Sequence, residues 1–139
     1  MVIPFASIYG HTETAANILA CRLAELGVPV EMHDVSVTHY SHVLSDCFKY
    51  SHIVFASPTY NNGIFDPMEH LLRDLAHHDL KGRKVALIQN GSWAPSSGKL
   101  MAEILGGMKD MEVIEAPVTL KSALAPGQEA ELDALARAL

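Results

Sequence analysis

Hydroxyl-bearing residues and a single glycine mark the point where the first apolar run becomes a helical pattern. The stretch SIYGHT places Ser7 and Thr12 on either side of Gly10. Glycine permits a tight turn, and a helix that begins near Thr12 directs unpaired N–H groups into that turn. Such donors, with the positive end of the helix dipole, favour a bound anion. No Lys or Arg lies in residues 7–14, so dipoles and hydroxyls would hold a phosphate. The alternative is that Ser and Thr only cap the helix.

Two further loops each carry an aromatic residue shortly after an apolar run. The stretch SPTYNNG (57–63) contains Tyr60, and NGSWAPSSG (90–98) contains Trp93, the single tryptophan. An aromatic ring can stack on a planar ligand, which adds about 1 kcal/mol beyond simple burial. Either residue alone is equally consistent with a structural anchor for its loop. Together, and opposite a phosphate loop, they predict a planar phosphorylated ligand.

Five apolar runs of strand length alternate with helical patterns and position these loops. The runs are residues 2–7, 29–35, 52–57, 84–90 and 112–118, and the helical patterns are 12–26, 41–48, 67–77, 98–108 and 128–139. The alternation predicts a single α/β domain over residues 1–139, with a doubly wound five-stranded parallel sheet in the order 2-1-3-4-5. The alternating second run indicates an edge strand. Pro4 lacks an N–H, so we expect a local irregularity in the first strand.

In a doubly wound sheet, ligands bind beyond the carboxyl ends of the strands where the strand order reverses. Here that point lies between the first and third strands, which both end in Phe-Ala-Ser, at 5–7 and 55–57. The loop after the fourth strand leaves from the same edge. The three loops are therefore expected to meet there.

Composition excludes several classes of protein. A chain of 139 residues with 49% hydrophobic residues is long enough for one core, and a net charge of −6 argues against a nucleic-acid partner. No apolar stretch reaches the length of a membrane span, so we expect a cytoplasmic protein. Cys21 and Cys47 are far apart and form no CxxC motif, and Cys21 is expected in the core.

Competing chemistry lacks its motifs. The dinucleotide fingerprint needs GxGxxG after the first strand, where only Gly10 is present. The stretch GSWAPSSGKL departs from a P-loop because Leu100 follows the lysine, where a P-loop has Ser or Thr. A phospho-receiver domain needs acidic residues where this chain has Phe-Ala-Ser. No catalytic triad is visible, so we predict no catalytic residue. The pairs His39/His42 and His77/His78 lack the partners of a known metal motif, so we predict no metal site.

The three loops resemble the FMN loops of the flavodoxin-like domain of flavodiiron proteins (A-type flavoproteins), within the flavodoxin superfamily. The resemblance covers nearly the whole chain and implies a flavodoxin-like fold with FMN as cofactor. It implies that the FMN phosphate is surrounded by Ser7, Ile8, Tyr9, Gly10, His11 and Thr12. One side of the isoalloxazine ring would be lined by Pro58, Thr59, Tyr60, Asn61, Asn62 and Gly63, and the other by Asn90, Gly91, Ser92, Trp93 and Ala94.

This chain departs from the family pattern in two respects. His11 stands where flavodoxins usually have asparagine, and it can still donate a hydrogen bond. Flavodiiron proteins reduce oxygen or nitric oxide on a two-iron domain that precedes the flavodoxin-like one, and its ligand cluster is absent from these residues. The chain is thus expected to be an excised domain or a free-standing relative.

The resemblance implies an FMN-binding electron-transfer module that relays electrons to a diiron oxygen or nitric oxide reductase domain outside this chain. It would be an oxidoreductase only together with that domain or a partner, such as a rubredoxin-like protein or a reductase that donates electrons. The alternative is a flavodoxin-like NAD(P)H-dependent FMN or quinone reductase. That enzyme would need space over the flavin for nicotinamide, where Tyr60 and Trp93 are expected.

Overall fold

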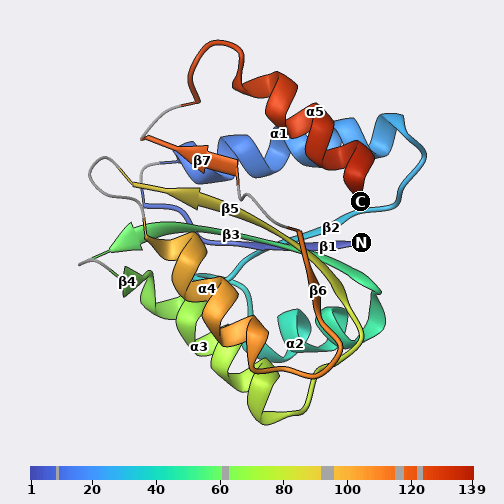
Figure 1. Ribbon diagram of the computed structural model, residues 1–139, viewed down its shortest axis with the longest axis vertical. Helices are drawn as coiled ribbons and strands as arrows, with labels where there is room; N and C mark the ends of the chain where they lie inside the picture. The colour runs from blue at the N-terminus through green and yellow to red at the C-terminus, as the bar shows by residue number, and fades with distance from the viewer. Residues whose placement is uncertain (9, 61–62, 92–95, 115–117, 122–123) are drawn as a thin grey trace.

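The computed structural model describes residues 1–8, 10–60, 63–91, 96–114, 118–121 and 124–139, without the side chains of Tyr40 and Tyr60. The domain has three layers, with a central sheet between two groups of helices (Figure 1). Helices α1 (His11–Glu25) and α5 (Gln128–Ala138) cover one face. Helices α2 (Tyr40–Lys49), α3 (Asp66–His77) and α4 (Ser97–Gly106) cover the other. Among the described residues, no helix is long and apolar enough to cross a membrane.

The sheet has the predicted order. Strands β1 (Val2–Phe5), β2 (Glu31–Asp34), β3 (His52–Tyr60), β5 (Lys84–Asn90) and β6 (Glu112–Val113) pair as β2-β1-β3-β5-β6, all parallel. Strand β2 lies at one edge, as its alternating pattern predicted. The doubly wound fold class is therefore confirmed.

Two details of the sheet differ from the prediction. The fifth strand is divided into β6 and β7 (Val118–Leu120), which both pair with β5. Residues 115–117 between them lie outside the described part. Strand β3 runs three residues further than predicted, and β4 (Gly63–Ile64) folds back on it in antiparallel pairing. The loop SPTYNNG thus begins inside the sheet.

Pro4 leaves a gap in the ladder between β1 and β3. Bridges join Val2 with Ile53 and Phe5 with Ala56, on either side of Pro4. The N–H of Ala6 donates to the carbonyl of Ala56 at 2.9 Å, and N–H directions alternate along a strand. The nitrogen of Pro4, two residues earlier, therefore faces β3 without a hydrogen to donate. On the other side Pro4 still pairs with His33 of β2.

The core has two parts, one on each face of the sheet. Large fully buried side chains include Leu19 and Leu23 of α1 on one face, and Leu72 and Leu75 of α3 on the other. The expectation for Cys21 was wrong, because it is exposed. Successive helical residues are separated by about 100°, so a residue two positions after Leu19 lies on the opposite side of the helix. Cys47 of α2 is buried instead.

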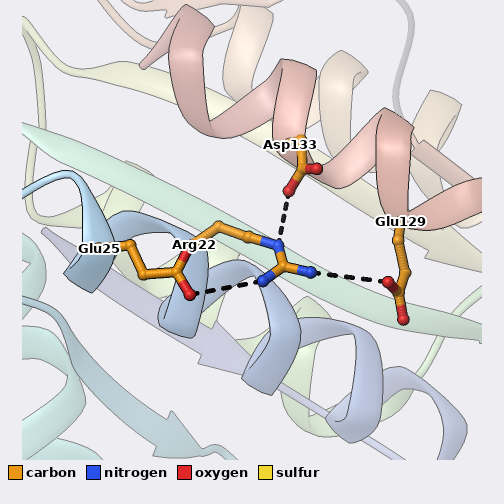
Figure 2. Close-up of polar contacts among 4 residues, drawn as sticks. All are labelled: Arg22, Glu25, Glu129 and Asp133. Carbon is orange, nitrogen blue, oxygen red and sulfur yellow. Dashed lines mark ion pairs between the residues drawn. The ribbon is translucent and has the colours of Figure 1, made fainter.

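Helices α1 and α5 are joined by an ion-pair network around Arg22 (Figure 2). The guanidinium Nε lies 2.7 Å from Asp133 of α5, and its two terminal nitrogens lie 3.6 Å from Glu129 and 3.5 Å from Glu25. The field of Asp133, followed by that of Glu25, raises the pKa of Arg22. Two carboxylates of α5, Glu129 and Asp133, thus connect the last helix to the first, and Glu25 of α1 faces the same cation.

Candidate functional site

The three predicted loops leave the same edge of the sheet. Strands β3 and β5 are parallel, and their arrowheads point to the same side in Figure 1. Their register aligns Ser57 with Gln89 and Pro58 with Asn90. Strand β1 is parallel to β3, and its following loop 6–10 leads into α1. The reversal point between β1 and β3 therefore carries the first two loops, and the third is adjacent.

The loop after β1 is closed by a serine and a glycine. The hydroxyl of Ser7 accepts the N–H of Gly10 at 2.9 Å and, at 3.5 Å, that of Glu13. Gly10 precedes α1 with φ of 84°, in the left-handed region where glycine is unstrained. This turn lets α1 begin directly at His11, as the spacing of SIYGHT predicted to within one residue. Tyr9 lies outside the described residues.

The start of α1 presents donors without partners. The first amide bonded within the helix is that of Thr14, which donates to the carbonyl of Gly10 at 3.0 Å. Among the described residues, the amides of His11 and Thr12 have no acceptor. The hydroxyl hydrogens of Ser7 and Thr12 are also left to donate, since both oxygens are used as acceptors. A group of donors without acceptors at a positive helix end suits an anion.

The loop before α1 and the first turn of the helix carry two titratable side chains, those of His11 and Glu13. Glu13 is exposed in the first turn of α1, and His11 is half-buried at the first helical position. No Lys or Arg occurs between residues 7 and 14. A phosphate in this loop would therefore be held by amides and hydroxyls.

A buried hydrogen bond connects the first loop to the end of β5. The side-chain amide of Asn90 donates to Oγ1 of Thr12 at 3.3 Å, across 78 positions in the chain. Thr12 is 2% exposed and Asn90 is 7% exposed. Asn90 was assigned above to the ring side of the cofactor. The structure brings its amide to the phosphate loop.

The second and third loops are joined by Thr59. Its hydroxyl oxygen accepts the backbone N–H of Ser96 at 3.0 Å and that of Ser97 at 3.1 Å. The Ser97 hydroxyl donates in return to the carbonyl of Ser57 at 3.0 Å. The N–H of Gly98, next in the chain, donates to the side chain of Gln89 at 2.9 Å. The first amides of α4 are thus capped by side chains from β3 and β5.

The remaining predicted residues fall into two groups. Ile8 is 42% exposed, Pro58 is buried, Gly63 begins β4, and the N–H of Gly91 donates to the carbonyl of Leu120 at 3.0 Å. The second group lies outside the described residues and comprises Tyr9, Asn61, Asn62, Ser92, Trp93 and Ala94. The side chain of Tyr60 is also outside the described part. The places of these residues around the phosphate (Tyr9) and the ring (the others) stay predictions.

Sequence reasoning missed Gln89 and Ser97. Gln89 also donates to the Thr119 hydroxyl at 2.7 Å, and the Gln128 side chain donates to the Thr119 carbonyl at 2.7 Å. These bonds connect α4, β5, β7 and α5. The available signal was a glutamine inside the otherwise apolar run KVALIQN, because a polar side chain in a covered strand needs partners.

Two titratable groups of α2 have distinct surroundings. The Asp46 carboxylate lies 2.5 Å from Nε2 of His33 in β2. Burial, and then the nearby charge of Asp46, raise the pKa of Cys47 to about 12. Within the described ranges, no three His, Cys, Asp or Glu side chains gather to hold a metal ion. The lack of a metal site stays a prediction.

A doubly wound parallel sheet in the order 2-1-3-4-5, with the switch point between its first and third strands, is the architecture of the flavodoxin-like class of domains. The family model for flavodoxin matches residues 3–123, so the chain belongs to the flavodoxin family. FMN is the cofactor of this family, and the prediction of FMN is confirmed at that level.

The chain is also similar to larger proteins. Rubredoxin-oxygen oxidoreductase of Megalodesulfovibrio gigas is 26% identical over 122 residues, which are 88% of this chain and 30% of that protein. The solved rubredoxin oxygen:oxidoreductase from Desulfovibrio gigas superposes with a TM-score of 0.90 at 26% identity, over 98% of this chain and 34% of that one. The flavodiiron protein of Giardia intestinalis gives 0.89 at 17% identity, over 99% and 34%. The chain thus spans about a third of these relatives, and the predicted likeness to the flavodoxin-like domain of flavodiiron proteins is confirmed.

Proposed function

We propose that this domain is an electron-transfer module whose FMN is held by the phosphate at the start of α1. The amides of His11 and Thr12 and the hydroxyls of Ser7 and Thr12 would donate to the phosphate oxygens. The observation that carries the proposal is this set of donors, for which the described residues supply no acceptor. When bound, FMN supplies the redox chemistry, since its isoalloxazine ring accepts and releases electrons.

The chain's own residues would bind and orient the cofactor. Ser7 closes the phosphate loop, and Thr59 holds the second and third loops against each other. We propose that these two loops flank the ring with Tyr60 and Trp93. Since residues 7–14 contain no Lys or Arg, hydroxyl and amide donors would hold the phosphate in place of a positive Lys or Arg side chain.

The relay is also a proposal. One similar protein is named as a rubredoxin-oxygen oxidoreductase, and this chain matches 30% of its length. We infer that electrons pass from a rubredoxin-like or reductase donor through FMN to a diiron domain outside these residues. A cytoplasmic location belongs to the same proposal.

The binding experiment compares FMN with riboflavin, which has the same ring and no phosphate. The purified protein should show the absorbance of oxidised flavin after FMN is added. Replacing Ser7 and Thr12 together by alanine should weaken FMN by roughly 100-fold, because each hydrogen bond to a charged group contributes about 1.5 to 3 kcal/mol. Riboflavin should change little. Equal losses for both ligands would contradict the phosphate assignment.

Trp93 gives a second test, of the ring side. If its indole lies against the flavin, tryptophan emission should be quenched in the FMN-bound protein and recovered after FMN is removed. It is the single tryptophan, so the signal has one source. Unchanged emission would make Trp93 a loop anchor.

Steady-state kinetics separate a relay from an NAD(P)H-dependent reductase. A relay domain with FMN bound should oxidise NADH and NADPH no faster than free FMN, with a quinone as acceptor. Rapid turnover would instead favour the reductase.

A further inference from the structure

The hydrogen bond between Asn90 and Thr12 fixes which way one hydroxyl group points. Asn90 Nδ2 can only donate, so Thr12 Oγ1 must accept in this contact. A hydroxyl has a single hydrogen. Because its oxygen is the acceptor here, that hydrogen points away from Asn90 and is left to donate to another acceptor.

The surroundings of Thr12 offer few acceptors to that hydrogen. Thr12 is the second residue of α1, next to the unpaired amides at the helix start. Its side chain is 2% exposed, so water does not compete freely for the hydroxyl. Among the described residues, no acceptor is bonded to the hydrogen of the Thr12 hydroxyl. An oxygen of a phosphate bound at this helix end would supply the acceptor.

We propose that Asn90 is a positioning residue for phosphate recognition, acting through Thr12. From the C-terminal end of β5, it orients the Thr12 hydroxyl so that this group donates to the FMN phosphate. The inference deepens the proposed function and rests on it. It also replaces the ring-side role that the loop resemblance implied for Asn90.

A matched neighbour separates this role from general support of the fold. Gln89 precedes Asn90 on β5 and also carries a side-chain amide, but it bonds Gly98 and Thr119. Replacing either amide by leucine removes hydrogen bonds near the same edge of the sheet. Only Asn90→Leu removes the partner of Thr12.

The test measures dissociation constants for FMN and riboflavin by flavin fluorescence, with folding of each variant checked by circular dichroism. We expect Asn90→Leu to weaken FMN about tenfold, which corresponds to about 1.4 kcal/mol, and riboflavin less than about twofold. Gln89→Leu should leave the ratio of the two constants unchanged. If Asn90→Leu does not fold, Asn90→Ser takes its place, because its shorter side chain cannot reach Thr12.

A double-mutant cycle with Thr12→Val shows whether Asn90 acts through Thr12. Thr12→Val should weaken FMN selectively, and adding Asn90→Leu should produce no further selective loss. Thr12→Ser, which keeps the hydroxyl, should preserve the effect of Asn90→Leu.

Two results would overturn the inference while FMN still binds the wild type. They are equal losses for FMN and riboflavin in Asn90→Leu, or a selective loss that persists in the Thr12→Val background. Failure of the wild type to bind FMN would overturn the proposed function itself.

Discussion

Helices α1 and α4 both begin at the edge of the sheet where the ligand is expected, yet their first amides differ. At α4, the N–H groups of Ser96, Ser97 and Gly98 are bonded to the side chains of Thr59 and Gln89. At α1, the described residues offer no acceptor to the first two helical amides, and the residue before the helix, Gly10, has no side chain to cap them. The protein's own side chains satisfy the start of α4, whereas the first two amides of α1 keep no acceptor among the described residues.

The difference indicates which helix start to expect as an anion site, because only donors left without partners are available to a ligand. By sequence, Ser96-Ser97-Gly98-Lys99 also offers two hydroxyls and a glycine, together with a positive charge. The loop before α1 has no positive residue. The α4 amides nevertheless have partners from β3 and β5, and a capped amide cannot also donate fully to a phosphate.

Breaking the α4 cap should have the largest effect, on stability. Thr59→Val keeps the shape of the side chain and removes the acceptor of two amides. We expect the free energy of unfolding to fall by about 2 kcal/mol, since an unsatisfied buried donor costs about 1 to 3 kcal/mol. Urea denaturation of the FMN-free protein measures this.

Thr59→Ser retains the hydroxyl and should recover most of that loss. The ratio of FMN to riboflavin affinity should be the same in all three proteins. A ratio that falls in Thr59→Val would mean that the α4 end contributes to phosphate binding, and the contrast between the two helices would fail.

A smaller effect is expected from strain at the α1 turn. A β-carbon at Gly10 would meet no atom within 4 Å, but φ of 84° costs an alanine about 1 kcal/mol. Relief of that strain would rotate the amides of His11 and Thr12. We therefore expect Gly10→Ala to lose about 1 kcal/mol of stability and also to bind FMN several-fold more weakly relative to riboflavin.

Gly27 provides the matched control at the other end of the same helix. Its φ is 80°, and a β-carbon there also meets nothing within 4 Å. Gly27→Ala should lose similar stability and keep the ratio of the two affinities. Equal loss of FMN selectivity in both variants would show that helix strain, rather than the phosphate turn, controls binding.

The smallest effect is expected from inorganic phosphate on the FMN-free protein. Phosphate at about three times its dissociation constant should stabilise the fold by roughly 0.8 kcal/mol, because it binds only the folded state. Sodium chloride at equal ionic strength is the control. Thermal unfolding should show the gain in Thr59→Val and not in Ser7→Ala. A gain that survives in Ser7→Ala would place the anion elsewhere.

The sequence predicted the sheet order and the meeting of three loops because both follow from local patterns. Continuous apolar runs predict covered strands, and parallel strands bring their carboxyl ends to one edge. The phosphate turn was also predictable, since Gly10 and the helix start are close in the chain. These features depend on few residues at a time.

The roles of Thr59, Gln89 and Asn90 could not be predicted in the same way. Each depends on the register between β3 and β5 and on where α4 begins, which together bring residues far apart in the chain within 3.3 Å. Cys21 was misplaced for a simpler reason. An apolar repeat identifies the buried face of a helix, but each residue must then be checked for whether it lies on that face. Cys21 is two residues from the buried Leu19, so it lies on the opposite side of the helix.

The separation of the bonded residues along the chain has a consequence for biosynthesis. Thr12 meets Asn90 across 78 positions, and Thr59 meets Ser97 across 38. Contacts between distant positions form after local ones, because a long segment must first be closed into a loop. An emerging polypeptide that ends before Asn90 contains the SIYGHT turn but not the partner of its threonine. We therefore expect the cofactor to join a completed domain, with a slow association phase in refolding mixtures that follows formation of β5 beside β3.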